Sequence, residues 1–282
     1  MARILDGKAL SNKILNNLAV EVERLKREGV IPKIALVLVG EDPSSKTYVK
    51  LKARRAKKIG AQSEVHNLPE SIGEEQLIKL IDKLSRDESI HGIVIQMPLP
   101  SHINERNVIN ALDPKKDVDG LHPLNLGKLL LGEECLASPA AEGIIALLEE
   151  YDVPIKDQEA VILGATELTG KPLAAMLINK GADVTICHST STRIEDYTKR
   201  ADIIVADIAK PKAIHGSMIK RGAAVIDCGF NYIENKLVGD VDFESAVQVA
   251  SAITPVPGGV GPMIIAMLLS NLIKAVKAYF LT

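Results

Sequence analysis

Short apolar segments alternate with longer amphipathic segments along the first half of this chain. Residues 34–39 and 92–96 are continuous apolar runs typical of buried strands, and residues 63–68 indicate a shorter strand. Residues 8–28 and 71–84 have the periodicity of amphipathic helices. Because strands that alternate with helices form a parallel sheet covered on both faces, this pattern constrains the chain to a doubly wound α/β fold.

The pattern restarts near residue 139, which predicts a second α/β domain. Four further strands are expected there, at 159–163, 183–187, 203–206 and 224–228, with helices at 142–151 and from Pro172 to Lys180, and a last helix is expected at 263–280. We predict two doubly wound domains. The first comprises residues 1–138 with the C-terminal segment 263–282, and the second, Rossmann-like, comprises residues 139–262.

Composition excludes several classes of protein. The chain has 282 residues and a net charge of −2, so no overall field favours nucleic acid or a membrane surface. The longest apolar run, residues 263–270, is shorter than the ~20 residues that span a bilayer. Three isolated cysteines fit neither a disulfide framework nor a zinc site. We therefore expect a cytoplasmic protein without a bound metal.

The stretch Ser45–Lys52 follows strand 34–39 and a turn at residues 40–43. Pro43 suits a first helical turn, and Asp42 or Ser44 is a suitable cap. Tyr48 and Lys52 are one helical turn apart and share a face, where a phenol and an ammonium can bind a substrate and move a proton. The alternative is a solvated basic helix, because six other lysines and arginines surround this pair.

A glycine turn follows the first strand of the second domain. Strand, glycine turn and helix is the arrangement that places a pyrophosphate at a helix N-terminus. Here Gly164 and Gly170 are separated by five residues, which is not the common dinucleotide spacing. Pro172 stands where a phosphate-binding loop of the Walker type needs Ser or Thr. The alternative is a turn without a ligand.

The end of the following strand bears on the choice of nucleotide. An NAD site usually has an acidic residue at the carboxyl end of this strand, but Asp183 lies at the opposite end. Ser189 and Arg193 follow the strand instead, and a hydroxyl with a cation suits a 2′-phosphate. This favours NADP, with NAD as the alternative.

Six motifs in order carry a family resemblance over nearly the full length. They are Gly40 to Lys52 with Ser45, Tyr48 and Val49, then Gly92–Pro100, Lys116–Gly120, Val225–Asn231, Gly239–Val241 and Thr254–Met263. With these motifs the chain resembles the bifunctional methylenetetrahydrofolate dehydrogenase/methenyltetrahydrofolate cyclohydrolase family. The resemblance implies oxidation of 5,10-methylenetetrahydrofolate with NADP and hydrolysis of the product to 10-formyltetrahydrofolate. It also implies one cleft between the two domains, a homodimer, and a place in purine biosynthesis.

The resemblance also implies roles for particular residues. Lys52 is the implied acid/base of the hydrolysis, Gln96 orients it, Tyr48 contacts the folate and Asp119 accepts the N–H groups of the pterin. The Asp117-Val-Asp119-Gly120 pattern lacks the further acids of a calcium loop. The implied substrate contacts add Ile95, Met97, Pro257, Gly258 and Gly259. The implied cofactor contacts are Gly164, Ala165, Thr166, Ser189, Arg193 and Phe230.

The chain departs from the family pattern at a few positions. Ala165 replaces an arginine that the family often places at the nucleotide turn, which bears directly on NADP preference. Ala209 replaces a glycine, Ile264 a threonine, and Ser138-Pro139-Ala140-Ala141 a Pro-Cys-Thr-Pro segment. None of these changes touches Tyr48 or Lys52, so we expect both activities. The alternatives are a dehydrogenase alone and a non-catalytic binding protein.

Overall fold

The computed structural model describes residues 2–234 and 236–280. Its strands form two parallel sheets that lie in two compact units, which confirms the predicted α/β class. The three-stranded unit comprises Lys13–Lys128, Glu134–Pro139 and Leu268–Thr282. The six-stranded unit comprises Met1–Asn12, Leu129–Glu133 and Ala140–Met267.

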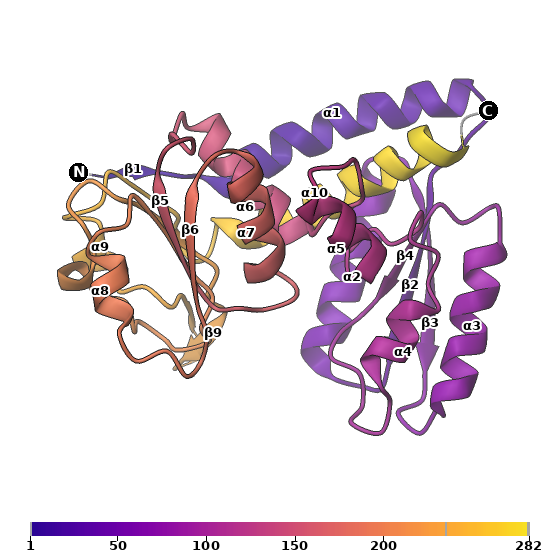
Figure 1. Ribbon diagram of the computed structural model, residues 1–282. Helices are drawn as coiled ribbons and strands as arrows, with labels where there is room; N and C mark the ends of the chain where they lie inside the picture. The colour runs from indigo at the N-terminus through magenta and orange to yellow at the C-terminus, as the bar shows by residue number, and fades with distance from the viewer. Residues whose placement is uncertain (1, 235, 281–282) are drawn as a thin grey trace. The chain divides into compact units, whose positions relative to one another are not determined.

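The sheet of the three-stranded unit has the order β3-β2-β4, with both pairings parallel. Its strands are β2 (Lys33–Val39), β3 (Gln62–Leu68) and β4 (Gly92–Ile95), as predicted to within a residue or two. Helices α2 (Pro43–Lys58) and α3 (Glu74–Arg86) lie on opposite faces of this sheet (Figure 1). Val37 on β2 packs with Leu77 and Ile81 of α3 in one apolar core.

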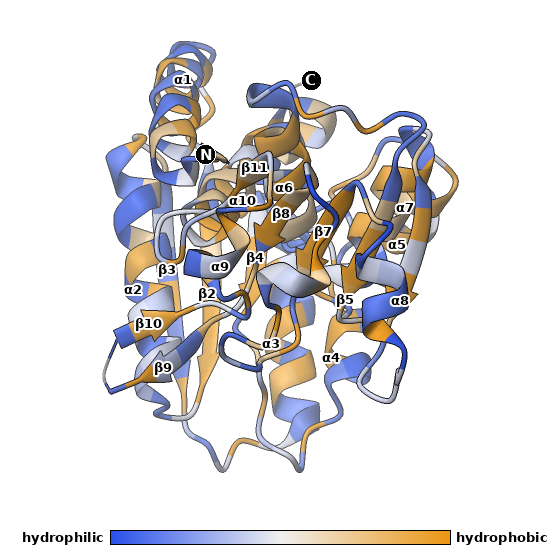
Figure 2. Cartoon of the chain, turned by 90° about the vertical axis from the view of Figure 1, so that its left-hand side faces the viewer, coloured by the Kyte–Doolittle hydropathy of each residue, from blue (hydrophilic) through white to orange (hydrophobic). Residues whose placement is uncertain are grey.

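The second sheet has the order β1-β11-β8-β7-β5-β6, and every neighbouring pair is parallel. Its strands are β1 (Arg3–Ile4), β5 (Glu159–Leu163), β6 (Asp183–Cys187), β7 (Ile203–Ala206), β8 (Ala224–Asp227) and β11 (Ala252–Ile253). The central strands are strongly apolar (Figure 2). Helices α6 (Pro139–Glu150) and α7 (Gly170–Asn179) cover one face, and α8 (Ile194–Thr198) and α9 (Phe243–Ala246) cover the other (Figure 1).

Strand β1 is an element that the sequence pattern does not predict. Arg3 pairs with Ala252 and Ile4 with Ile253, and residues 2–12 belong to the six-stranded unit. The predicted division into functional domains, at residues 138 and 263, stays a prediction.

The start of α3 corrects a prediction. The helix predicted over residues 71–84 begins only at Glu74, so Ser71 and Glu74, which have the spacing of a capping box, do not form one. The Glu74 carboxylate accepts hydrogen bonds from Asn104 N (2.6 Å) and Asn107 Nδ2 (2.8 Å) instead. A tertiary contact has therefore taken the side chain that local spacing assigned to the cap.

The remaining elements complete the chain. They are α1 (Gly7–Arg27), α4 (Glu105–Asn110), α5 (Pro123–Leu130), a 3-10 turn (Gly216–Met218), the antiparallel hairpin β9 (Asn231–Ile233) and β10 (Lys236–Val238), α10 (Val260–Ala275) and a π-helical turn (Val276–Phe280). Helix α5 and the hairpin are not predicted from the sequence.

The apolar part of the C-terminal helix is longer than the run at residues 263–270 that the sequence shows. By length and composition alone, Val260–Phe280 could cross a membrane, unlike the shorter run predicted at residues 263–270. However, 56% of its most apolar window is buried inside the protein, and a core helix passes the same test. Leu268, Leu269 and Leu272 are completely buried, so packing accounts for the apolar character of these positions.

Candidate active site

Helix α2 begins directly after the carboxyl end of β2. The chain turns at Gly40, whose φ of +84° suits glycine. Asp42 is the cap of the two predicted candidates, because its carboxylate accepts a hydrogen bond from Ser45 N at 2.7 Å. Pro43 opens the helix, as expected for a residue without a backbone N–H. The following turn carries Tyr48 and Lys52.

Burial separates Lys52 from the other basic residues of α2. The buried positions of this helix are Ser45, Val49, Lys52 and Ala56, which form one inward stripe at helical spacing. The Lys52 side chain is only 8% exposed, whereas Lys50 is exposed. A lysine is seldom buried without a partner, so its position indicates more than a solvated charge run.

Gln96 is the partner of Lys52. Its backbone N donates to Val37 O at 2.9 Å, which extends the pairing of β4 with β2 by one residue. Its side-chain Nε2 donates to Met97 O at 2.8 Å, and Lys52 Nζ donates to Gln96 Oε1 at 3.2 Å. Since the amide nitrogen is engaged by Met97, the amide oxygen is the atom that faces the ammonium. Two predicted site residues are thus in contact.

Asp119 lies in the loop that leads away from β4. The side chain is half-buried, and burial raises the pKa of its carboxyl group, while the positive charge of Lys52 opposes that shift. The structure therefore brings Asp119 into the electrostatic range of Lys52. Asp117, two residues earlier, has a different role, because its carboxylate accepts hydrogen bonds from His122 N (2.7 Å) and Asn125 Nδ2 (3.0 Å).

The other predicted substrate contacts are less closely grouped. Tyr48 is half-buried on the same helix face as Lys52, Ile95 is buried at the end of β4, and Met97 is half-buried. Their roles stay predictions.

Pro257, Gly258 and Gly259 belong to the six-stranded unit, where they have a packing function. Lys8 N donates to Gly258 O at 2.9 Å, and a Cβ at Gly7 would overlap Gly259 O. The glycines thus allow the close approach of the start of α1. Their predicted contact with folate is untested by this packing.

The glycine turn after β5 is closed by tight backbone contacts. Gly164 has a φ of +122°, and a Cβ at Gly170 would overlap the Gly164 carbonyl oxygen. The Thr166 hydroxyl accepts hydrogen bonds from Thr169 N (3.2 Å) and Gly170 N (3.1 Å), at the start of α7. The same hydroxyl donates to Asp207 Oδ2 at 2.9 Å. Thr166 thus binds the start of α7, where Thr169 is the N-cap residue, and ties the turn to the end of β7.

The remaining predicted cofactor residues follow the carboxyl ends of neighbouring parallel strands. Ser189 is exposed just after β6. Phe230 follows β8 and is 47% exposed, and its ring meets the Tyr232 ring edge-to-face, with the ring centroids 5.6 Å apart. Arg193 is exposed, and its Nε forms an ion pair with Asp196 at 2.6 Å. Because carboxyl ends of parallel strands meet at one edge of a sheet, these residues share the edge that carries the glycine turn.

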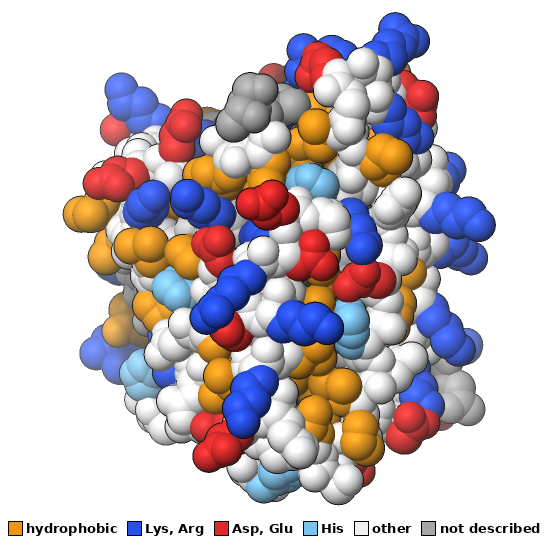
Figure 3. All heavy atoms as spheres, turned by 90° about the vertical axis from the view of Figure 1, so that its right-hand side faces the viewer, with side chains coloured by type: hydrophobic (Ala, Val, Ile, Leu, Met, Phe, Trp, Pro, Cys, Tyr) orange, Lys and Arg blue, Asp and Glu red, His pale blue; other side chains and the backbone are white. Residues whose placement is uncertain are grey.

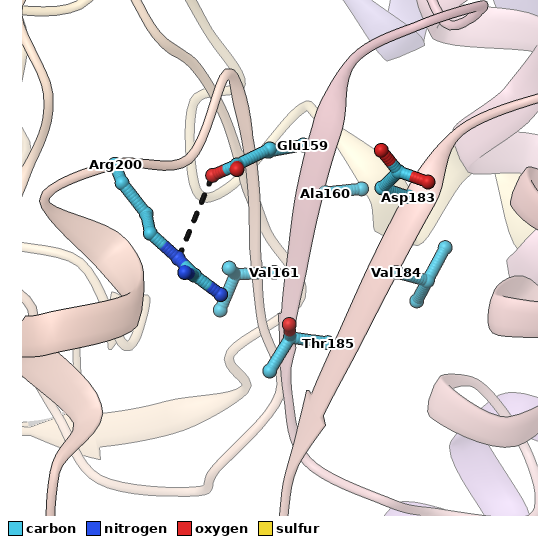
Figure 4. Close-up of a pocket in the computed structure, with 7 residues that line it drawn as sticks. All are labelled: Glu159, Ala160, Val161, Asp183, Val184, Thr185 and Arg200. Carbon is cyan, nitrogen blue, oxygen red and sulfur yellow. Dashed lines mark ion pairs between the residues drawn. The ribbon is translucent and has the colours of Figure 1, made fainter.

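Two cavities of the six-stranded unit do not coincide with the predicted sites. One of about 90 Å³ lies at the opposite, amino-terminal ends of β5 and β6, where Arg200 pairs with Glu159 at 3.5 Å (Figure 4). Another of about 450 Å³ lies among α6, α7 and α10. Neither is lined by a predicted site residue. Within residues 2–234 and 236–280, no group of three or more His, Cys, Asp or Glu residues could hold a metal ion.

Two buried polar residues near these sites were missed by sequence reasoning. Asp240 is fully buried, and its carboxylate accepts hydrogen bonds from the backbone N–H groups of Ile208, Ala209 and Lys210. Asn271 is fully buried in α10. The available signals were the Gly239-Asp240-Val241 motif and a single amide within an apolar helix.

The fold and the sites define a class of protein: a two-domain α/β protein with a strand–glycine turn–helix unit in one part, and a buried lysine bonded to a half-buried glutamine in the other. The chain belongs to the tetrahydrofolate dehydrogenase/cyclohydrolase family. The catalytic-domain model of this family matches residues 5–119, and its NAD(P)-binding-domain model matches residues 138–280. The first match ends at Asp119, so it includes Tyr48, Lys52 and Gln96.

Relatives resemble the chain over nearly its whole length. A bifunctional protein FolD from Nautilia profundicola is 48% identical, with 98% of each chain covered. The bifunctional FolD structure from Campylobacter jejuni is 43% identical, with a TM-score of 0.97 and coverage of 98% of this chain and 99% of that one. A Trypanosoma brucei dehydrogenase-cyclohydrolase, solved with NADP and an inhibitor, is 35% identical, with a TM-score of 0.95 and coverage of 100% and 99%.

Proposed function

We propose that this protein is a bifunctional enzyme of one-carbon folate metabolism. It oxidises 5,10-methylenetetrahydrofolate to 5,10-methenyltetrahydrofolate with NADP, and it hydrolyses the methenyl product to 10-formyltetrahydrofolate. Family membership supports both activities, and the relatives from Nautilia profundicola and Campylobacter jejuni carry the word bifunctional in their names.

The observation that supports the hydrolytic half is the hydrogen bond between buried Lys52 and half-buried Gln96. Lys52 is 8% exposed as a residue, and its ammonium lies 3.2 Å from the oriented amide oxygen of Gln96, whereas a lysine with no role beyond surface charge is seldom buried. A dehydrogenase without hydrolase activity has no evident use for a proton-transferring group there.

The six-stranded unit has residues that fit NADP. The glycine turn between β5 and the N-terminus of α7 has the strand–turn–helix arrangement that binds a pyrophosphate, and Gly164 and Gly170 allow the close backbone contacts that give the turn its shape. Gly164, Ala165, Thr166, Ser189, Arg193 and Phe230 would hold the cofactor. When bound, NADP supplies the acceptor for the hydride that leaves the methylene carbon. Exposed Arg193 offers a positive charge for a 2′-phosphate that Ala165 cannot provide.

Lys52 performs the proton transfers of the hydrolysis. A water molecule adds to the methenyl carbon and loses a proton to the neutral amine of Lys52. The bond from that carbon to nitrogen 5 then breaks, and the Lys52 ammonium protonates this nitrogen as the formyl group forms on nitrogen 10. The second proton of the water leaves to solvent, so the positive charge of the substrate ends as a released proton. Gln96 holds Lys52 in place throughout, because its amide is fixed by Met97.

The other residues of this unit bind the folate. Asp119 accepts the paired N–H donors of the pterin, for which a carboxylate is geometrically suited. Tyr48 contacts the ring from the Lys52 face of α2, and Ile95 and Met97 line the site. From the six-stranded unit, we infer that Pro257, Gly258 and Gly259 contribute backbone contacts.

The partners and the setting complete the proposal. We infer a cytoplasmic homodimer that supplies 10-formyltetrahydrofolate to purine biosynthesis and binds neither nucleic acid nor membrane. The net charge of −2 and the face drawn in Figure 3, where acidic and basic side chains are intermixed, support the part of this proposal that excludes nucleic acid and membrane.

The test is a comparison of cofactors. The purified protein is given 5,10-methylenetetrahydrofolate with NADP or NAD at matched concentrations, and formation of the reduced nicotinamide is followed. We expect the higher kcat/KM with NADP. A strong preference for NAD refutes the assignment of Ser189 and Arg193, and no reduction of either cofactor refutes the dehydrogenase. Hydrolysis of 5,10-methenyltetrahydrofolate, measured separately, distinguishes the bifunctional enzyme from a dehydrogenase alone.

A further inference from the structure

Asn271 is a completely buried amide in a helix whose neighbouring positions are apolar. The residue lies in α10 beside the buried Leu269 and Leu272. Its Nδ2 atom donates two hydrogen bonds, to Val118 O at 3.0 Å and to Ala137 O at 2.7 Å. Its Oδ1 atom is buried and accepts no hydrogen bond from any described residue. Since an unsatisfied buried acceptor is costly, the two donated bonds are the reason to keep an amide here.

The two bonds hold the chain on both sides of Asp119. Val118 immediately precedes Asp119, and its carbonyl is bound directly. Gly120 immediately follows, and it packs against the peptide between Ala137 and Ser138, where a Cβ would lie 2.6 Å from Ser138 N. Ala137 is the second residue that Asn271 binds. The Asn271 amide therefore fixes the carbonyl of Val118, which precedes Asp119. It also fixes the carbonyl of Ala137, and Gly120, which follows Asp119, packs against the Ala137–Ser138 peptide.

The loop also has local contacts: Gly120 N donates to Asp117 O at 3.1 Å in a turn that spans Asp119. Ile93 N donates to Lys116 O at 2.7 Å, and the Asp117 carboxylate is bound by His122 and Asn125. These contacts secure the entrance of the loop. Asn271 differs from these contacts because it ties the backbone around Asp119 to α10, a helix that is distant in the sequence.

We propose that Asn271 is a positioning residue for folate recognition, which acts by fixing the backbone that presents Asp119. This inference rests on the proposed function, in which Asp119 accepts the N–H groups of the pterin. Displacement of a recognition group by a fraction of an ångström weakens binding without removing any contact residue.

The experiment measures the Kd for tetrahydrofolate, which lacks the one-carbon unit and so undergoes neither reaction. Four full-length variants are compared with the wild type: Asn271→Leu, Asp119→Ala, the double variant, and Leu269→Ala. Leu269→Ala is the matched control, because it removes buried volume two residues away on the same helix and leaves both carbonyl contacts in place. The Kd for NADP is measured in each variant as a second control.

We expect Asn271→Leu to raise the Kd for tetrahydrofolate about tenfold while the Kd for NADP changes less than about twofold. Once Asp119 is removed, Asn271→Leu should have little additional effect, because both changes disable the same contact. Leu269→Ala should lower the Tm and leave both Kd values near those of the wild type.

The outcomes separate the two proposals. If Asp119→Ala leaves the Kd for tetrahydrofolate unchanged, the assigned role of Asp119 fails, and the positioning role fails with it. If Asp119→Ala weakens binding but Asn271→Leu does not, only the positioning role is refuted. Fully additive effects, or equal weakening by Leu269→Ala, likewise overturn it. Should Asn271→Leu not fold, Asn271→Ser retains one donor and is expected to give an intermediate Kd, whereas a wild-type Kd refutes the inference.

Discussion

Replacement of Lys52 by methionine tests the centre of the proposed chemistry. Methionine is nearly as long as lysine and is apolar, so it fills the same buried stripe beside Val49 and Ala56 without an ammonium. The hydrogen bond to Gln96 is lost, at about 1.5–3 kcal/mol for a bond to a charged group. Relief from burying that charge offsets much of this loss. We therefore expect the free energy of unfolding to change by no more than about 2 kcal/mol.

The catalytic effect of the same substitution should be far larger. A positioned acid/base contributes roughly 10²–10⁴-fold to a rate, which corresponds to about 3–5 kcal/mol of the activation barrier. No other basic residue lies on the buried stripe of α2, so none can replace Lys52 from that face. We expect the rate of 5,10-methenyltetrahydrofolate hydrolysis to decrease by a factor near the upper end of that range, about 10⁴.

The assay follows hydrolysis under single-turnover conditions and NADP binding by titration. Lys50→Met is the matched control, because it makes the same chemical change at an exposed position of the same helix. We expect the control to hydrolyse at the wild-type rate and Lys52→Met to bind NADP normally. A hydrolysis rate within a factor of about three of the wild type in Lys52→Met would refute the assigned role.

Other predictions concern the six-stranded unit and its pH dependence. Gly170→Ala should abolish NADP binding, because the added Cβ overlaps the Gly164 carbonyl oxygen, whereas Gly127→Ala has open space and should be tolerated; NADP titration with a folding check decides this. Ala165→Arg should raise the preference for NADP over NAD about tenfold, measured as a ratio of kcat/KM values. Burial raises the pKa of Asp227 to about 6, so the folded state holds its proton more tightly than the unfolded state. This stabilisation is complete below about pH 4 and is lost as the pH rises through about 6. The free energy of unfolding of the wild type, relative to that of Asp227→Asn, should therefore decrease by about 3 kcal/mol between about pH 4 and 7. Chemical denaturation of both proteins at each pH measures this change.

The element types were predictable from the sequence because buried strands are continuous apolar runs. Residues 159–163, 183–187 and 203–206 form strands with the predicted limits. Local rules failed where a distant side chain competed. Glu74 has the spacing of a capping residue, but its carboxylate binds Asn104 and Asn107, so α3 begins later than predicted. The short strand β1 was invisible because two residues carry no periodicity.

The stretch Ser45–Lys52 by itself determined that a tyrosine and a lysine share one face of a helix, since a turn of α-helix brings residues four apart together. It could not determine whether that face was buried, because seven basic residues in one helix have similar sequence surroundings. Tertiary packing decided that point, as it buried Lys52 and placed the oriented amide of Gln96 beside it. The contact between Asn271 and the backbone around Asp119 joins residues more than a hundred positions apart. Only the folded chain could bring them together, because no local pattern encodes which carbonyl a buried amide will meet.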